Sequence, residues 1–212
     1  MSFFSNPRNI GPGPITGSPM TGLRHRVCVC VERVLDSCLK QCNNENTILH
    51  LGNFNPHNPS SPLKFLDAMC TRTDATVRDL QICRIEERPS FARIKCKINI
   101  PVQVNFNDAN NVRSTAESEI TVMEDVVLFV PSPSIFPFEV VANTSCNCPV
   151  GTYVGNNSFN VTACITIITK VVAKTDLLIP TYGFCPSPSC VEFEEEVCDR
   201  FFDLPLYPSG RG

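Results

Sequence analysis

Four closely spaced cysteines lie near the N-terminus, in the segment VCVCVERVLDSCLKQC (residues 27–42). Thiol side chains can hold a metal ion, exchange electrons as a redox pair, or join two chains through a disulfide. The whole chain has 13 cysteines among 212 residues, a high proportion. Because 13 is odd, pairing within one chain leaves at least one thiol over. The spacing of the cysteines has to decide between the three chemistries.

Metal and redox sites favour spacings that this sequence lacks. Structural zinc sites and thioredoxin-like centres both use Cys-x-x-Cys, whereas the closest pairs here have a single residue between the cysteines. The chain has three histidines, none at ligand spacing from another: His25, His50 and His57. We therefore predict no metal and no cofactor, and keep a cysteine-rich metal-binding or redox protein as the alternative interpretation.

No catalytic constellation stands out in the sequence. It has no glycine-rich phosphate loop and no serine nucleophile elbow. The acidic run 194–196 is most simply the solvated face of a helix. The prediction is that the chain is not an enzyme and has no catalytic residues.

Charge and hydropathy limit the partners. The net charge is −3 and the basic residues are scattered, which argues against a nucleic-acid partner. No stretch of 18 apolar residues occurs, which argues against a membrane partner.

Disulfide crosslinking fits the cysteine distribution best. Cys28 and Cys30 are expected on one face of a strand, where a bond between them would be strained, so each can capture a cysteine elsewhere. Cys146 and Cys148 are expected in a loop, and Cys185 and Cys190 on either side of a proline-rich turn. The candidate crosslinking cysteines, with their pairing left open, are Cys28, Cys30, Cys38, Cys42, Cys146, Cys148, Cys185, Cys190 and Cys198.

The four remaining cysteines are not predicted to form crosslinks. Cys96 lies among the apolar residues of a strand and is expected to be a small buried hydrophobic residue. Cys164 falls on the face opposite the apolar residues of its own strand. Cys70 and Cys83 have no informative context.

The cysteine segment needs a scaffold, and its period changes at residue 34. Residues 26–34 alternate as a strand does. From there Leu35, Cys38, Leu39 and Cys42 follow a helical spacing, which predicts a short helix. Near the other end, Ser189 stands three residues before Glu192 in a capping-box pattern, which predicts a C-terminal helix.

The centre of the chain is strongly β. Residues 91–106 alternate apolar and polar side chains over seven apolar positions, which predicts a half-buried strand, bent or bulged at Pro101. Residues 107–111 supply a turn, and residues 116–130 run back as an antiparallel partner. Further strands are expected at 136–142 and 158–174. The predicted fold is mainly β: an antiparallel β-sandwich or jelly-roll-like domain with an extended N-terminal arm and a short C-terminal helix.

These elements suggest four regions. Residues 1–26 form a Pro/Gly-rich arm, and residues 27–62 a cysteine-rich strand–helix connector. Residues 63–182 form the β-sandwich core. Residues 183–212 form a cysteine-rich helix and tail.

The cellular compartment poses a conflict. Cysteine-rich chains usually belong to oxidising compartments, yet the N-terminal residues lack the basic and apolar regions of a signal peptide. The expectation is a protein made in the cytoplasm but built for disulfides or metal. An adhesive or ligand-binding β-sandwich on the cell surface, a third interpretation, would need an export route.

Four phrases of the sequence resemble cysteine-rich spore-surface proteins of endospore-forming Firmicutes, the group that builds coat, exosporium and appendage layers. They are VCVCVERVLDSC, RIKCKINIPVQVNFNDANN, VLFVPSPSIFPFEV and YGFCPSPSCVEFEEEVCDRFFDLPLYP, and the resemblance covers about residues 27–208. It carries no catalytic signature. The chain departs from appendage subunits by being longer and by its C-terminal helix and cysteine group.

The resemblance implies a jelly-roll fold and an N-terminal connector that crosslinks neighbours through cysteines. It also implies synthesis in the mother-cell cytoplasm and deposition on the spore surface, where oxidising conditions follow cell lysis. The expected function is therefore non-enzymatic: self-assembly into a disulfide-crosslinked spore-surface layer or filament. The expected partners are further copies of the chain and other spore-surface proteins.

Overall fold

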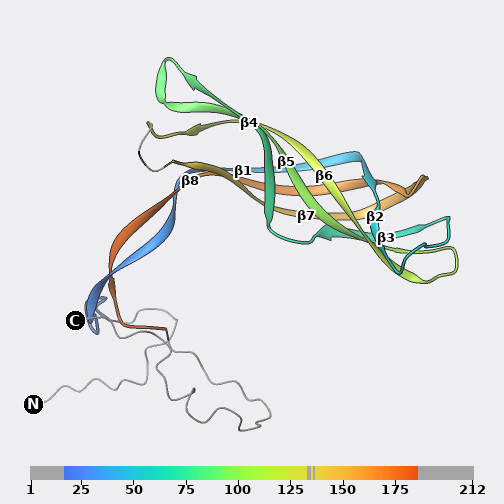
Figure 1. Ribbon diagram of the computed structural model, residues 1–212, viewed down its shortest axis with the longest axis horizontal. Coiled ribbons are helices and arrows are strands. Elements are labelled where there is room, and N and C mark those ends of the chain that lie inside the picture. Colours follow the sequence, from blue (N-terminus) through green and yellow to red (C-terminus); the bar gives the residue numbers. More distant parts are fainter. Residues whose placement is uncertain (1–16, 133–134, 136, 186–212) are drawn as a thin grey trace, which may run out of the picture. The chain divides into compact units, whose positions relative to one another are not determined.

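The computed structural model describes residues 17–132, 135 and 137–185, and within them every regular element is a β-strand (Figure 1). The strands are β1 (His25–His50), β2 (Gly52–Asn55), β3 (Lys64–Cys70), β4 (Asp74–Ile85), β5 (Arg88–Asn107), β6 (Arg113–Phe129), β7 (Glu139–Gly155) and β8 (Ser158–Thr181). The prediction of a mainly β, antiparallel chain is confirmed. The described residues divide into two compact units, Cys28–Leu177 and a smaller unit of residues 17–27 with 178–185.

The larger unit is built on one sheet with the strand order β1-β8-β7-β3-β5-β6-β2. β4 lies off this path and pairs with β5 and β7, the same two strands that flank β3. β3 pairs with β5 at residues 102–107 and β4 pairs with it at residues 88–99. β3 and β4 therefore lie end to end between β5 and β7.

The inward face of β5 forms the centre of the core. The alternating apolar residues predicted to share one face are all buried: Ile94, Cys96, Ile98, Ile100, Val102, Val104 and Phe106. Alternation of the same kind continues through β6, β7 and β8. The period of two in the sequence thus identified the core face correctly.

The sheet curls until distant strands meet. The rings of Phe106 on β5 and Phe159 on β8 lie 6.1 Å apart between centroids. Between β1 and β6, Asp36 accepts a hydrogen bond from the backbone N–H of Phe129 (2.7 Å). A single eight-stranded sheet therefore surrounds its own core; the finer prediction of a two-layer sandwich or jelly roll is not confirmed.

The helix predicted from Val34 to Cys42 is wrong, because β1 runs through the whole segment without a break. Two of the residues that suggested the helix, Cys38 and Cys42, are an even number of positions apart, so they also fit one side of a strand. Cys38, Lys40 and Cys42 share the partly buried side of the strand, whereas Leu39 is 63% exposed. Pairing with β8 satisfies the backbone of β1, and this tertiary contact overrides the local pattern.

Of the bend or bulge expected at Pro101, the bulge does not occur in the pairing with β6. The register between β5 and β6 continues unshifted through the pair Pro101–Glu119. The carbonyl of Pro101 accepts a hydrogen bond from Thr71 N–H (3.1 Å), and on an antiparallel strand a residue's N–H points the same way as its C=O. The missing N–H therefore faces the gap between β3 and β4, where it breaks no ladder bond.

The smaller unit contains the described ends of the chain. Arg24 N–H donates to the carbonyl of Thr181 (3.0 Å), and the Tyr182 hydroxyl contacts the carbonyl of Pro19. The part of the predicted arm that is described, residues 17–26, thus ends in the first residues of β1 and is bonded to residues 181–182. The rest of that arm and the predicted C-terminal helix lie outside the described residues.

The turn after β5 yields a pH prediction. The Asp108 carboxylate accepts hydrogen bonds from the backbone N–H groups of Val112 and Asn110, each at 2.8 Å. These bonds, the Val112 bond foremost, hold the pKa of Asp108 below its ordinary value of 3.8. Because the pKa of Asp108 is lower in the folded than in the unfolded chain, its ionised form stabilises the fold at any pH above the unfolded-state pKa. This contribution is lost as the pH falls through the folded-state pKa.

We expect Asp108→Asn to flatten the acid side of the stability profile, because asparagine keeps an acceptor oxygen but cannot titrate. Urea unfolding of both proteins at neutral pH and near pH 3 measures the difference. Parallel profiles for the two proteins would contradict this account of the turn.

Candidate functional site

The exposed pair Cys28 and Cys30 lies near the start of β1. Both thiols are exposed and free, and the valines that alternate with them, Val29 and Val31, are partly buried. The strand predicted for this segment, and the outward direction of its two cysteines, are therefore confirmed. Figure 1 shows β1 beside β8, its neighbour in the sheet.

Cys38 and Cys42, expected on one face of a helix, lie instead on the partly buried side of β1. Each is half-buried, and they pack against two different parts of the core. Cys42 also lines an open surface hollow together with Cys164. Cys164 itself, left undecided from the sequence, is exposed, and its thiol lies 3.8 Å from Oδ1 of Asn43.

Cys146 and Cys148 were expected in a loop, which is wrong, since both lie within β7. Their side chains are 5% and 0% exposed. The loop was suggested by Pro149 and Gly151, but Pro149 falls at a register shift between β7 and β8, where a strand tolerates it, and Gly151 pairs in register with Val161. These two thiols are not available to another chain in this fold.

A third thiol meets this buried pair. Cys70, the last residue of β3, is partly exposed, and its thiol is close enough to that of Cys146 for the two to influence each other's pKa. On its other side Cys146 lies 3.9 Å, sulfur to sulfur, from Cys148. We call Cys70, Cys146 and Cys148 the thiol cluster.

Interactions within the thiol cluster separate the three pKa values. The interaction with Cys146 lowers the pKa of Cys70 to about 7, outweighing the opposite effect of burial. The pKa of Cys148 is also lowered by its interaction with Cys146, while that of Cys146 is raised, first by Cys148 and then by Cys70. Cys70 is thus both the most accessible member and one that forms a thiolate readily.

A second cluster surrounds the buried carboxylate of Glu124. Its Oε2 atom pairs with the ammonium group of Lys40 at 3.0 Å, whereas Oε1 has no hydrogen-bond partner among the described residues. Cys38 and Cys96 lie nearby, and burial followed by the charge of Glu124 raises the pKa of both thiols. The prediction that Cys96 is buried is confirmed.

The remaining cysteines are peripheral. Cys83 and Cys185 are exposed. The candidates Cys190 and Cys198 lie outside the described residues. Sequence reasoning missed Cys70, since its relation to the β7 thiols depends on strand pairing 76 positions away and leaves no local signal.

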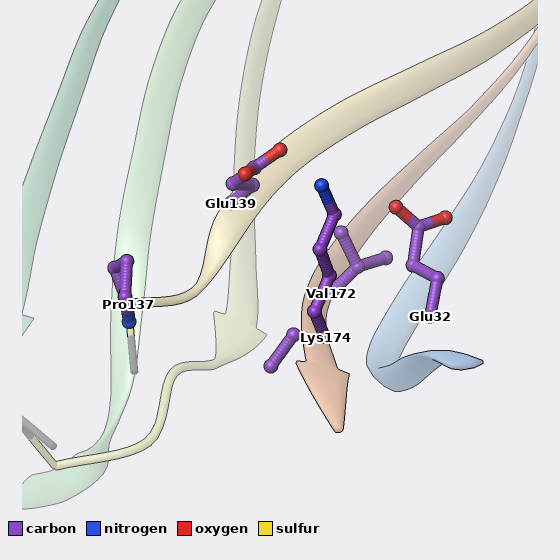
Figure 2. A pocket seen from close by; sticks show the side chains of 6 residues that line it. Glu32, Pro137, Glu139, Val172 and Lys174 are labelled. Atoms are coloured by element: carbon purple, nitrogen blue, oxygen red, sulfur yellow. The ribbon is translucent and has the colours of Figure 1, made fainter. Parts of the chain in front are cut away.

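A further hollow contains charges but no thiol. Figure 2 shows Lys174 on β8 between Glu32 on β1 and Glu139 on β7, and the described ion pairs include none at this site. Within the described residues, no group of three metal-ligating side chains is placed to hold an ion. The same part of the chain has no helix with the length and apolarity needed to cross a membrane.

Comparisons with known proteins add no assignment. No family model, no curated protein and no solved structure matches this chain. Functional inference therefore rests on the cysteines and their positions in the sheet.

Proposed function

We propose that this chain is a non-enzymatic structural protein whose copies assemble into a layer or filament joined by disulfides through the outward cysteines of β1. The observation that carries the proposal is the exposed pair Cys28 and Cys30. Residues two apart on a strand are separated by about 6.6 Å between Cα atoms, near the limit for a disulfide. Each thiol therefore pairs more readily with a cysteine of a neighbouring copy.

The positions of the other cysteines support this division of roles. The exposed thiols of Cys83 and Cys164 offer partners for such disulfides on the outside of a neighbouring copy. The members of the thiol cluster on β7 and the thiol of Cys96 are buried and belong to the interior. Joining subunits in this way adds resistance to dissociation rather than stability to each fold.

The proposed cellular location, the spore surface, follows from the resemblance to spore-surface proteins. The protein is made in the mother-cell cytoplasm, deposited on the spore surface with other surface proteins, and oxidised once that cell lyses. A jelly-roll-like sandwich, as in appendage subunits, is part of the same proposal. Its support is the curled sheet, which places β5 and β8 on opposite sides of one core.

Electrophoresis of native material with and without reductant tests the proposal, together with electron microscopy of the same sample. We expect a ladder of multimers that collapses to the monomer on reduction, and fibres or sheets in the images. An unreduced sample that runs as a monomer would refute covalent assembly. The absence of any regular assembly in the images would refute the structural role as well.

A further inference from the structure

The thiol cluster lies at an interruption of the sheet. β3 ends at Cys70 and β4 begins at Asp74, and both pair with β7. Their ladders with β7 comprise only two residue pairs each, at 147–148 and at 142–143. Between them, Thr144 N–H donates to the carbonyl of Thr73 (2.7 Å). This junction has fewer ladder bonds than the long pairing of β5 with β6.

The register of β3 with β7 places two thiols opposite each other. Ala68 pairs with Cys148 and Met69 with Asn147. One further step along both antiparallel strands sets Cys70 opposite Cys146. Ala68, Cys146 and Cys148 are all buried, while Met69 is 50% exposed, so the two opposed thiols share the inward face.

Geometry then selects one of the two bonds open to Cys146. Directly opposed residues of an antiparallel pair have Cα atoms about 4.5–5.5 Å apart, within the range of ordinary disulfides. The alternative partner, Cys148, is two residues along the same strand, at about 6.6 Å. The present sulfur–sulfur distance of 3.9 Å between Cys146 and Cys148 is a contact between thiols and does not remove that strain.

We infer that Cys70 and Cys146 form an intramolecular disulfide when the protein meets a small-molecule disulfide, and that Cys148 stays reduced. The structure thereby assigns the cysteines two separate uses, outward crosslinking on β1 and an internal bond between β3 and β7. The inference is independent of the proposed assembly, because the bond lies within one chain and uses neither Cys28 nor Cys30.

The exchange has two balanced steps. The Cys70 thiolate attacks one sulfur of the small-molecule disulfide, forming a mixed disulfide and releasing one thiolate, which takes up a proton. Cys146 then loses its proton and attacks Sγ of Cys70, releasing the second small thiol. Two protein thiols are oxidised and one external disulfide is reduced to two thiols. Partial exposure of Cys70 gives the reagent access, and the register of β3 with β7, which sets Cys146 opposite Cys70, prepares the second step.

The bond would fix the junction between β3 and β4. It closes a long loop between residues 70 and 146, and loops of this length give a disulfide its largest effect on the unfolded chain. We therefore expect the oxidised protein to unfold roughly 5–10 °C above the reduced protein.

Peptide mapping tests the inference. The full chain carrying Cys28→Ser and Cys30→Ser, which removes the outward pair, is treated with glutathione disulfide, alkylated and digested with trypsin without reduction. The expected product links the peptide of residues 65–72 to the peptide of residues 114–170, which contains Cys146, Cys148 and Cys164. Adding Cys148→Ala should preserve both this linkage and the rise in melting temperature, whereas adding Cys146→Ala should abolish both.

The inference would be overturned by a linkage that survives Cys146→Ala, by a bond between Cys146 and Cys148, or by no linkage in a folded protein. Circular dichroism establishes that each variant retains its β structure. Should Cys146→Ala fail to fold, Cys70→Ala replaces it, since this position is only partly buried and must lose the same linkage.

Discussion

The double variant Cys28→Ser, Cys30→Ser is expected to lose nearly all of the reductant-sensitive multimers formed by the wild-type protein. The reason is positional, since both thiols are exposed on one side of β1 and neither pairs readily with the other. Serine at exposed sites should change the free energy of unfolding by no more than about 0.5 kcal/mol. Any loss of multimers therefore reports the missing thiols and not a damaged fold.

The comparison needs a matched exposed cysteine. Cys83, on β4, is also exposed, and Cys83→Ser removes at most one of the bonds that a neighbour's β1 can make. We expect this control to retain multimers, while the double variant runs as a monomer in unreduced gels after identical air oxidation. A double variant with the same ladder as the wild type would place the crosslinks elsewhere in the chain.

The strands were the most predictable part of this protein. The alternation over residues 91–106 gave the core face of β5, and the turn residues that follow it gave the antiparallel return in β6. Both signals are local, because side-chain direction on a strand follows directly from sequence position. The helix expected around Cys38 failed for the same reason, since a short amphipathic pattern fits either period and only the neighbouring strand decides.

The arrangement of the cysteines was only partly predictable. The alternation of side chains along each strand correctly predicted that Cys28 and Cys30 point outward and that Cys96 is buried. The thiol cluster depends on the register of β3 with β7, and the partner of Glu124 depends on how the sheet curls. Both are long-range properties set by packing, for which no periodicity in one strand carries information.

The ion pair between Lys40 and Glu124 is expected to produce the largest change in stability. The side chain of Glu124 is completely buried, that of Lys40 is 39% exposed, and the ammonium group is 3.0 Å from Oε2. Lys40 also donates to the carbonyl of Met123 at 3.2 Å, which fixes β1 against β6. Lys40 compensates the charge of Glu124 through Oε2, and the other carboxylate oxygen, Oε1, has no hydrogen-bond partner among the described residues.

Lys40→Met should therefore lower the free energy of unfolding by about 3 kcal/mol, the lower part of the range for breaking a buried pair. Methionine keeps the apolar stem of lysine but leaves the Glu124 charge uncompensated in the core. The double variant Lys40→Met, Glu124→Met removes both charges, and it should recover most of the loss because an apolar pair of similar volume can replace a buried ion pair.

Lys97→Met supplies the matched control, since Lys97 pairs with Asp79 at 2.7 Å on the surface, where both side chains are exposed. Exposed pairs contribute at most about 1 kcal/mol, so this variant should stay close to the wild type. Denaturant unfolding at neutral pH measures all four proteins. If Lys40→Met were no less stable than Lys97→Met, or if the double variant were as unstable as Lys40→Met, the uncompensated charge of Glu124 could not be the cause. The recovery in the double variant is the decisive result, because lost packing at position 40 alone would not be reversed by a change at position 124.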